Sequence, residues 1–222
     1  DTGELLSVGT NLYTEELVSP YIVISGSSVS DTNSDAVVVD NGIAQSLDYA
    51  GLVHINSNIG IAGDSWPVGT VAQPVSNLAD AKLIAATYNI SNYRIYGTVI
   101  FNTDLHKSVV YGGNINDIVV FQGVNVSGTT FKECVLTGSY NGFISGEVVQ
   151  LADGLTGMDG IFRDSGVQGK MYFNSGATCS ILNSSSMVPG NSNQPSVFLA
   201  NDVKLSVRKY SGTMEVYNST SG

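Results

Sequence analysis

Hydrophobic residues between positions 118 and 183 fall in short runs that polar and glycine-containing segments separate. The runs are rich in β-branched and aromatic residues, and they are Ile118–Phe121, Glu133–Leu136, Gly142–Ile144, Glu147–Val149, Lys170–Phe173 and Ser180–Leu182. Such residues suit the pleated, half-buried surface of a β-sheet. A Ser-Gly or Thr-Gly pair recurs between or within the runs, with glycines at positions 128, 138, 146, 157, 166 and 176. Because glycine adopts turn conformations that other residues resist, the pattern predicts short strands joined by turns.

The spacing of these pairs points to a repeated unit. Successive glycines are 10, 8, 11, 9 and 10 residues apart. Regular short strands and turns are typical of all-β proteins, and repetition this loose favours coils stacked along one axis over a sandwich. Two intervals would make one coil of about 20 residues. The predicted fold is therefore all-β, a parallel β-solenoid (β-helix), with these side chains inward: Val119, Phe121, Val135, Phe143, Val149 and Ile181.

One segment before the repeats has helical spacing. Ser76 and Asn77 are good N-cap residues, and Asp80 falls in the first turn, where the helix dipole favours an acidic side chain. The predicted inner face of this helix consists of Leu78, Ala81, Ile84, Ala85 and Tyr88. Stacked coils leave an apolar end and an open strand edge, so we expect the helix over 76–88 to cap the solenoid.

Four segments follow from this reading. Residues 1–60 are an N-terminal lead-in or attachment segment, in which Ile43–Tyr49 is expected to form a short helix. Residues 61–92 are the entry loop and capping helix, and residues 93–190 are the β-solenoid. Residues 191–222 are C-terminal strands that break the ten-residue spacing and either close the solenoid or pair with neighbouring chains. The chain begins at Asp1, which indicates processing or a fragment of something longer.

Composition narrows the function classes. Charged residues make up 13% of the chain, against about 25% in average proteins, and the net charge is -10. The chain lacks the Lys and Arg clusters with which proteins bind phosphates, so we expect no nucleic acid partner. The same charge disfavours anionic membrane surfaces, and no apolar run reaches the roughly 20 residues of a membrane span.

The residues that could carry chemistry are scattered. Cys134 and Cys179 lie in strand-like runs, where a buried free thiol is a more frequent role than a disulfide. His54 and His106 are isolated, so no zinc-ligand spacing is present. No GxGxxG or lysine-bearing phosphate loop occurs in the entry loop. We therefore predict no catalytic residue, no metal site and no cofactor.

Two sets of residues nevertheless deserve comparison with sugar-active sites. Glycosidases need two carboxylates about 5 to 10 Å apart, and the nearest candidates are Asp153, Asp159 and Asp164. Isolated carboxylates on turns more often cap those turns. The aromatic residues that could stack on sugar rings are Trp66, Tyr111, Tyr140 and Tyr172, although most aromatics in strands pack against the core.

Several motifs resemble β-helical virion proteins of tailed bacteriophages. The run Pro67–Ala81 looks like the "GT…PV-N-ADA" entry found before β-helical domains in that family. Gly160–Gly166 and Leu182–Ser186 look like its rungs, and Arg208–Gly212 resembles its "R-YSG" closing strand. The motifs occur in the family's order over about Gly51–Asn218. The chain departs from the family at Arg163–Ser165, which stands where a cysteine is common, and residues 1–50 match nothing in it.

The resemblance implies a component of a phage particle. We expect a non-enzymatic tail fibre or receptor-binding segment, in which the coils present loops to the host surface. The alternatives are a capsid decoration protein or head fibre, and a polysaccharide-degrading tailspike. Phage proteins of this type are generally threefold, so we also expect a homotrimer in contact with other virion proteins, with a host surface glycan as the candidate ligand.

Overall fold

The computed structural model describes residues 37–40, 43–46, 49–114, 116–187 and 195–218. Most of the predicted lead-in lies outside these residues. Two short strands, β1 (Val37–Asp40) and β2 (Ile43–Ser46), form an antiparallel pair. The short helix predicted from Ile43 is therefore wrong. A segment of that length forms little helix by itself, whereas pairing with the β-branched run in β1 satisfies its backbone groups.

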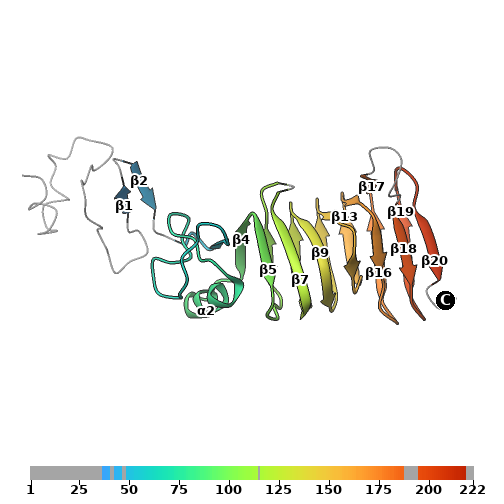
Figure 1. The fold of residues 1–222 in the computed structure, drawn as a ribbon, viewed down its shortest axis with the longest axis horizontal. Coiled ribbons are helices and arrows are strands. Elements are labelled where there is room, and N and C mark those ends of the chain that lie inside the picture. The colour runs from blue at the N-terminus through green and yellow to red at the C-terminus, as the bar shows by residue number, and fades with distance from the viewer. Residues whose placement is uncertain (1–36, 41–42, 47–48, 115, 188–194, 219–222) are drawn as a thin grey trace, which may run out of the picture.

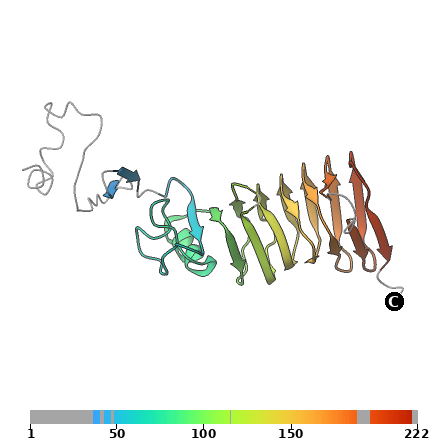
Figure 2. The ribbon, with the colours of Figure 1, turned by 45° about the horizontal axis from the view of Figure 1, so that its top comes forward.

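Beyond this pair the chain winds into a parallel β-solenoid, as the sequence predicted (Figure 1). One face is an eight-stranded sheet of parallel strands. In chain order these strands are β3 (Val53–Asn56), β4 (Asn92–Tyr96), β6 (Val109–Tyr111), β8 (Thr130–Lys132), β10 (Ile144–Glu147), β13 (Gly160–Arg163), β16 (Thr178–Leu182) and β19 (Lys204–Arg208). Figure 2 shows the strands following one another along a single axis.

A ten-stranded parallel sheet forms the remaining faces. It begins with three strands, β5 (Thr98–Phe101), β7 (Ile118–Asn125) and β9 (Val135–Asn141). After β9 it divides into two limbs, because Val135 and Leu136 pair with one strand and Ser139 pairs with another. The first limb contains β11 (Gln150–Leu151), β14 (Gly166–Val167) and β17 (Ser185–Ser186). The second contains β12 (Leu155–Thr156), β15 (Lys170–Tyr172), β18 (Ser196–Leu199) and β20 (Glu215–Asn218).

The coils are less regular than the glycine spacing predicted, and the central ones are shorter. Phe131 pairs with Gly146 and Gly146 with Phe162, so two central coils contain 15 and 16 residues. The preceding coil, from Val110 to Phe131, contains 21 residues. The expected 20 residues per coil is therefore too long for the centre, where two-residue strands and tight corners replace loops.

The Ser-Gly and Thr-Gly pairs do not all mark turns. Gly128, Gly157 and Gly176 adopt positive φ angles of 76°, 90° and 75°, which glycine accommodates without strain. Gly146 instead lies inside β10 and faces the interior. A Cβ atom there would come within 2.6 Å of Cδ1 of Phe162, so the missing side chain makes room for this ring on the next coil.

The interior is a continuous column of apolar side chains. Five of the six predicted inward residues are buried, and Phe143 is wrong because it is 41% exposed while the adjacent Ile144 is fully buried. Val135 is buried but does not belong to the core cluster, which its neighbour Leu136 joins. Phe121 is in contact with the rings of Phe131 and Tyr140 at centroid distances of 5.3 and 5.2 Å.

The helix α2 (Leu78–Tyr88) lies at the N-terminal end of the solenoid (Figure 1). Asn77 caps it by accepting a hydrogen bond from the Asp80 amide at 2.9 Å. Four of its five predicted inner residues are buried, but Tyr88 is 45% exposed. The helix is not the whole cap. Backbone groups of the entry loop cover the open edge of β3, where the Asn56 amide donates to the Val75 carbonyl at 2.8 Å.

The C-terminal strands continue the stack. β18 pairs in register with β15, and β19 pairs with β16. Val207 and Val216 occupy interior register positions but are 40% and 57% exposed, because no further coil in the described residues covers them. The strand-rich C-terminal segment is thus built from the last coils of the solenoid itself.

Candidate functional site

One corner of the solenoid repeats the same conformation on five successive coils. The residue that follows each strand β8, β10, β13, β16 and β19 has a positive φ angle. We call these residues the corner row, and with their φ angles they are Glu133 (52°), Val148 (55°), Asp164 (52°), Asn183 (49°) and Lys209 (52°). A left-handed residue turns the chain out of the eight-stranded sheet toward the side formed by β9, β11, β14 and β17 without an inserted loop.

Backbone hydrogen bonds continue through this corner. The amide of Val148 donates to the Arg163 carbonyl of the next coil at 3.0 Å, and the amide of Asp164 donates to the Leu182 carbonyl at 3.1 Å. The ladder therefore passes unbroken from one sheet to the other. Side chains reinforce this ladder, because the side-chain amide of Asn183 donates a hydrogen bond to the Asp164 carboxylate.

The residues just after the corner point inward, and the hydroxyl groups among them form hydrogen bonds with backbone groups of the corner. Ser165 and Ser184 are 3% and 4% exposed. The Ser184 hydroxyl accepts a hydrogen bond from the Ser165 amide at 3.2 Å and donates to the Leu182 carbonyl at 2.8 Å. These buried hydroxyls are used by the fold and are not available as nucleophiles. Cys134 occupies the position that corresponds to Ser165 on the coil two before it. Burial raises the pKa of the Cys134 thiol to about 12.

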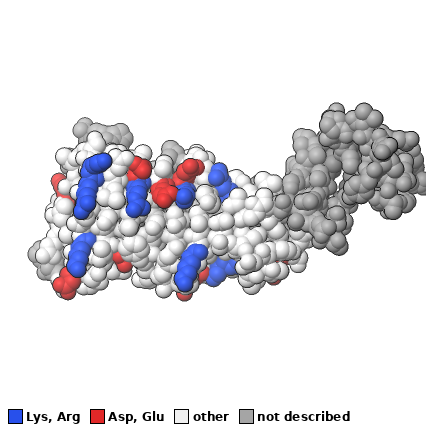
Figure 3. Space-filling model, turned by 180° about the vertical axis from the view of Figure 1, so that it is seen from behind, with Lys and Arg blue, Asp and Glu red and all other residues white. Residues whose placement is uncertain are grey.

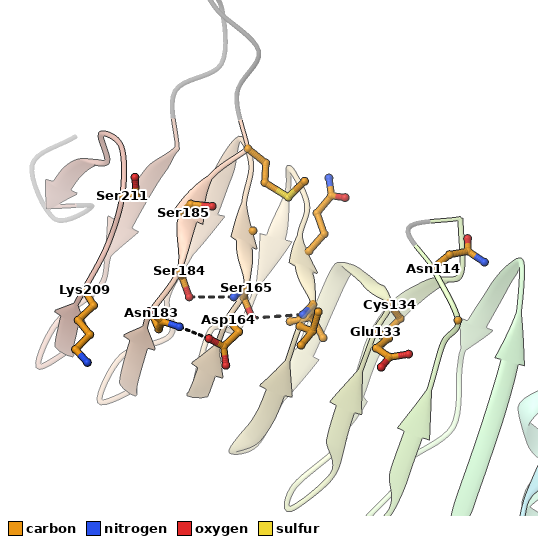
Figure 4. A pocket seen from close by; sticks show the side chains of 16 residues that line it. Asn114, Glu133, Cys134, Asp164, Ser165, Asn183, Ser184, Ser185, Lys209 and Ser211 are labelled. Atoms are coloured by element: carbon orange, nitrogen blue, oxygen red, sulfur yellow. Dashed lines mark hydrogen bonds between the residues drawn. The ribbon is translucent and has the colours of Figure 1, made fainter.

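An open groove of about 680 Å³ runs along the corner row. Gly113 and Asn114 lie at one end and Lys209 and Ser211 at the other, as Figure 4 shows for the labelled Asn114, Lys209 and Ser211. Neutral polar side chains such as Gln150, Asn183 and Ser185 line it beside three charged ones, but apolar atoms make up the larger part of its exposed lining. Val148 and Met187 add exposed apolar surface at 58% and 41% exposure. Such a lining combines neutral hydrogen-bonding groups with apolar surface and carries few charges.

The three aspartates considered as candidate catalytic groups are not brought together at one corner. Asp153 lies between β11 and β12, Asp159 between β12 and β13, and Asp164 between β13 and β14. Each carboxylate accepts a hydrogen bond from the following coil. The donors are the Lys170 amide at 2.6 Å, the Thr178 amide at 3.1 Å and the Asn183 side chain. All three therefore serve the turn-stabilising role that isolated carboxylates commonly have.

The predicted sugar-stacking aromatics are also used by the fold. Tyr140 is fully buried, which rules it out as an exposed platform. Tyr172 stacks on Phe198 with a centroid distance of 4.9 Å and an interplanar angle of 16°, so one face of its ring is covered. Trp66 is partly buried against the core. Tyr111 points outward from β6, with the Lys132 ammonium 6.0 Å from its ring centroid.

The histidines and cysteines lie apart. The His54 ring is in hydrogen-bond contact with the Tyr96 hydroxyl at 2.9 Å, and burial together with nearby Arg94 lowers the pKa of His54 to about 4. His106 is exposed. Cys134 and Cys179 are both free and buried, as the sequence predicted. Within the described ranges no three His, Cys, Asp or Glu side chains gather as metal ligands do, and no helix has the length and apolar character to span a bilayer.

The sequence reading missed the corner row, although its signal is present. Each corner is a triplet of an outward residue, a left-handed residue and an inward residue, as in Lys132-Glu133-Cys134 and Arg163-Asp164-Ser165. The glycines of the Ser-Gly and Thr-Gly pairs lie at other positions than the corner row. Aligning the chain on these triplets gives the true coil boundaries.

No protein-family model, no curated protein and no solved structure matched the chain.

The corner row makes a prediction about stability. Val148 is the one β-branched residue in the row, and a β-branched side chain resists a positive φ angle, whereas asparagine tolerates it. We expect Val148→Asn to raise the free energy of unfolding by about 1 kcal/mol, measured by urea denaturation. The matched control is Val109→Asn, at an outward position in ordinary strand conformation, which should lower stability. A Val148→Asn protein less stable than the parent would contradict the assigned corner conformation.

Proposed function

We propose that this chain is a non-enzymatic component of a tailed-phage particle, a tail fibre or receptor-binding segment that attaches to a host surface glycan. The observation that supports the proposal is the groove along the corner row, in which neutral hydrogen-bonding side chains lie beside apolar surface along a stack of coils. Sugar hydroxyls are recognised through neutral amides and hydroxyls such as those of Gln150, Asn183 and Ser185. The phage assignment itself rests on the sequence motifs of the entry loop and rungs.

The stack also suits mechanical display. Coil-to-coil hydrogen bonds and side-chain clamps such as Asp153 to Lys170 repeat along the axis, so the surface keeps its shape over its whole length. Repeat folds use such extended surfaces for binding. We also propose that the chain forms a homotrimer. Sedimentation at micromolar concentration tests this, and a 23.3 kDa monomer throughout would contradict the trimer.

The location in the particle can be tested directly. An antibody is raised against the purified chain and labelled with gold, and negative-stain images are taken of phage particles produced from a genome that encodes the chain. We expect gold at the tail, because attachment to a host requires it there. Gold on the head would instead support the capsid decoration or head-fibre alternative, and particles without label would contradict a virion role altogether. Particles lacking the gene product are the control for antibody specificity.

A second candidate function has one specific observation in its favour. Glu133 and Asp164 both line the groove and stand two coils apart in the corner row, which places their backbones roughly 9–10 Å apart. Inverting glycosidases hold two carboxyl groups about 6.5–9.5 Å apart across a bound sugar chain, and side chains on backbones at this separation could span that distance. Both side chains are exposed, whereas a glycosidase general acid is characteristically shielded from water. We therefore favour binding without cleavage.

The cleavage alternative is decided by product analysis. The parent protein and a Glu133→Gln, Asp164→Asn double variant are incubated with host surface polysaccharide, and released oligosaccharides are measured. We expect none from either protein. Release by the parent that the double variant loses would overturn the non-enzymatic proposal. An Asp153→Asn variant is the matched control, because Asp153 lies on a different corner.

A further inference from the structure

A row of cationic side chains runs along the outer face of the eight-stranded sheet, beside the corner row. Strand pairing aligns one residue from each of seven successive strands, and it is the last residue of every one of them except β4. In order along the axis these residues are Arg94, Tyr111, Lys132, Glu147, Arg163, Leu182 and Arg208. All point outward, because the residue before each of them on the strand has an interior register position. We call the four cations, Arg94, Lys132, Arg163 and Arg208, the cation row.

The cation row has a regular period. A cation occupies every second coil, and neutral or acidic residues occupy the coils between. Neighbouring parallel strands are about 4.8 Å apart, so successive cations are about 9–10 Å apart along the axis. Figure 3 shows Lys and Arg recurring at intervals along the solenoid, with acidic side chains between them near one edge. Four of the chain's nine Lys and Arg residues are in this row, although the chain as a whole has a net charge of -10.

The row is only partly neutralised. Lys132 forms an ion pair with Glu147 at 2.7 Å. No other ion pair is present among the residues that the structure describes, so Arg163 and Arg208 have no carboxylate partner there. Lys209 follows Arg208 in the sequence and belongs to the corner row. It adds another cation at the end of the groove nearest Arg208. This leaves the strongest positive charge over the later coils.

The spacing distinguishes between anionic polymers. One nucleic acid strand carries a phosphate about every 3.4 Å, so roughly three phosphates would face each interval between cations. The excess phosphates would meet Glu133, Glu147 and Asp164, which lie beside or within the row. The length of one sugar in an extended polysaccharide is comparable to the spacing of about 4.8 Å between neighbouring coils along the axis. A polysaccharide with an acidic group on alternate sugars would therefore place each charge opposite a cation.

We propose that the cation row and the adjoining groove bind an extended acidic polysaccharide along the solenoid axis, with one carboxylate on every second sugar. The cations contact the acidic groups, and neutral groove side chains such as Asn114, Gln150 and Asn183 face the hydroxyls of the same polymer. The inference rests on the proposed attachment role and specifies the chemical class of its glycan.

The test uses hyaluronan fragments, which carry one carboxylate on every second sugar, and the whole chain at low ionic strength. The row variant is Arg163→Gln, Arg208→Gln. The matched control is Lys170→Gln, Lys204→Gln, which removes the same charge from exposed strand positions outside the row. Exposed ion pairs contribute about 0.2–1 kcal/mol each, so the row variant should bind about two- to thirtyfold more weakly while the control keeps parental affinity. Thermal melts of both variants show that the fold is intact.

Three further measurements fix the outcome. Binding should weaken as salt is added, and uncharged dextran and a single-stranded DNA oligonucleotide should bind more weakly than hyaluronan. Absence of hyaluronan binding by the parent, equal losses in the two variants, or tighter binding of DNA would each overturn the inference. Gold labelling of the tail without hyaluronan binding would overturn this inference alone and leave the virion proposal in place.

Discussion

The structure depends on carrying one parallel hydrogen-bond ladder around a sharp corner. Five residues with φ angles between 49° and 55° make that turn, and the amide of each of the first four reaches the next coil. L-residues accept this conformation at a cost, which is smallest for asparagine and aspartate, whereas achiral glycine adopts it freely. The chain uses Glu, Val, Asp, Asn and Lys there, and the neighbouring coils hold each of them in place. Every outward side chain beside the corner consequently falls into register, and both the groove and the cation row follow from that register.

The interior imposes the second constraint, because the coils differ in length but must share one core. Aromatic rings of Phe101, Phe121, Phe131 and Tyr140 fill the wider early coils. In the shorter central coils a glycine at position 146 faces Phe162 and leaves space for it. Large and small residues thus compensate across neighbouring coils, as close packing of a protein interior requires. This compensation allows 15-residue and 21-residue coils to stack without a break.

The sequence predicted the class of fold but not its period, and the reason is physical. Alternation of apolar residues with glycine reports strands and turns, so the solenoid, the helix near 78–88 and most inward residues could be inferred. Gly146 and Phe143 could not, because glycine serves equally for a turn or for space beside a ring, and a one-residue shift moves a side chain to the other face. The groove depends on which residues become neighbours between coils. That Glu133 and Asp164 line the same groove follows only from the true register.

Register between coils is therefore the central claim, and disulfide trapping measures it most directly. Ser145 on β10 pairs with Ile161 on β13, and both point outward. Paired positions in adjacent parallel strands have Cα atoms about 4.8 Å apart, within the range that a disulfide spans. Ser145→Cys with Ile161→Cys should oxidise readily in the folded protein. Ser145→Cys with Arg163→Cys, displaced by two residues along β13, should not. Preferential oxidation of the displaced pair would contradict the register from which the fold, the groove and the cation row are all derived.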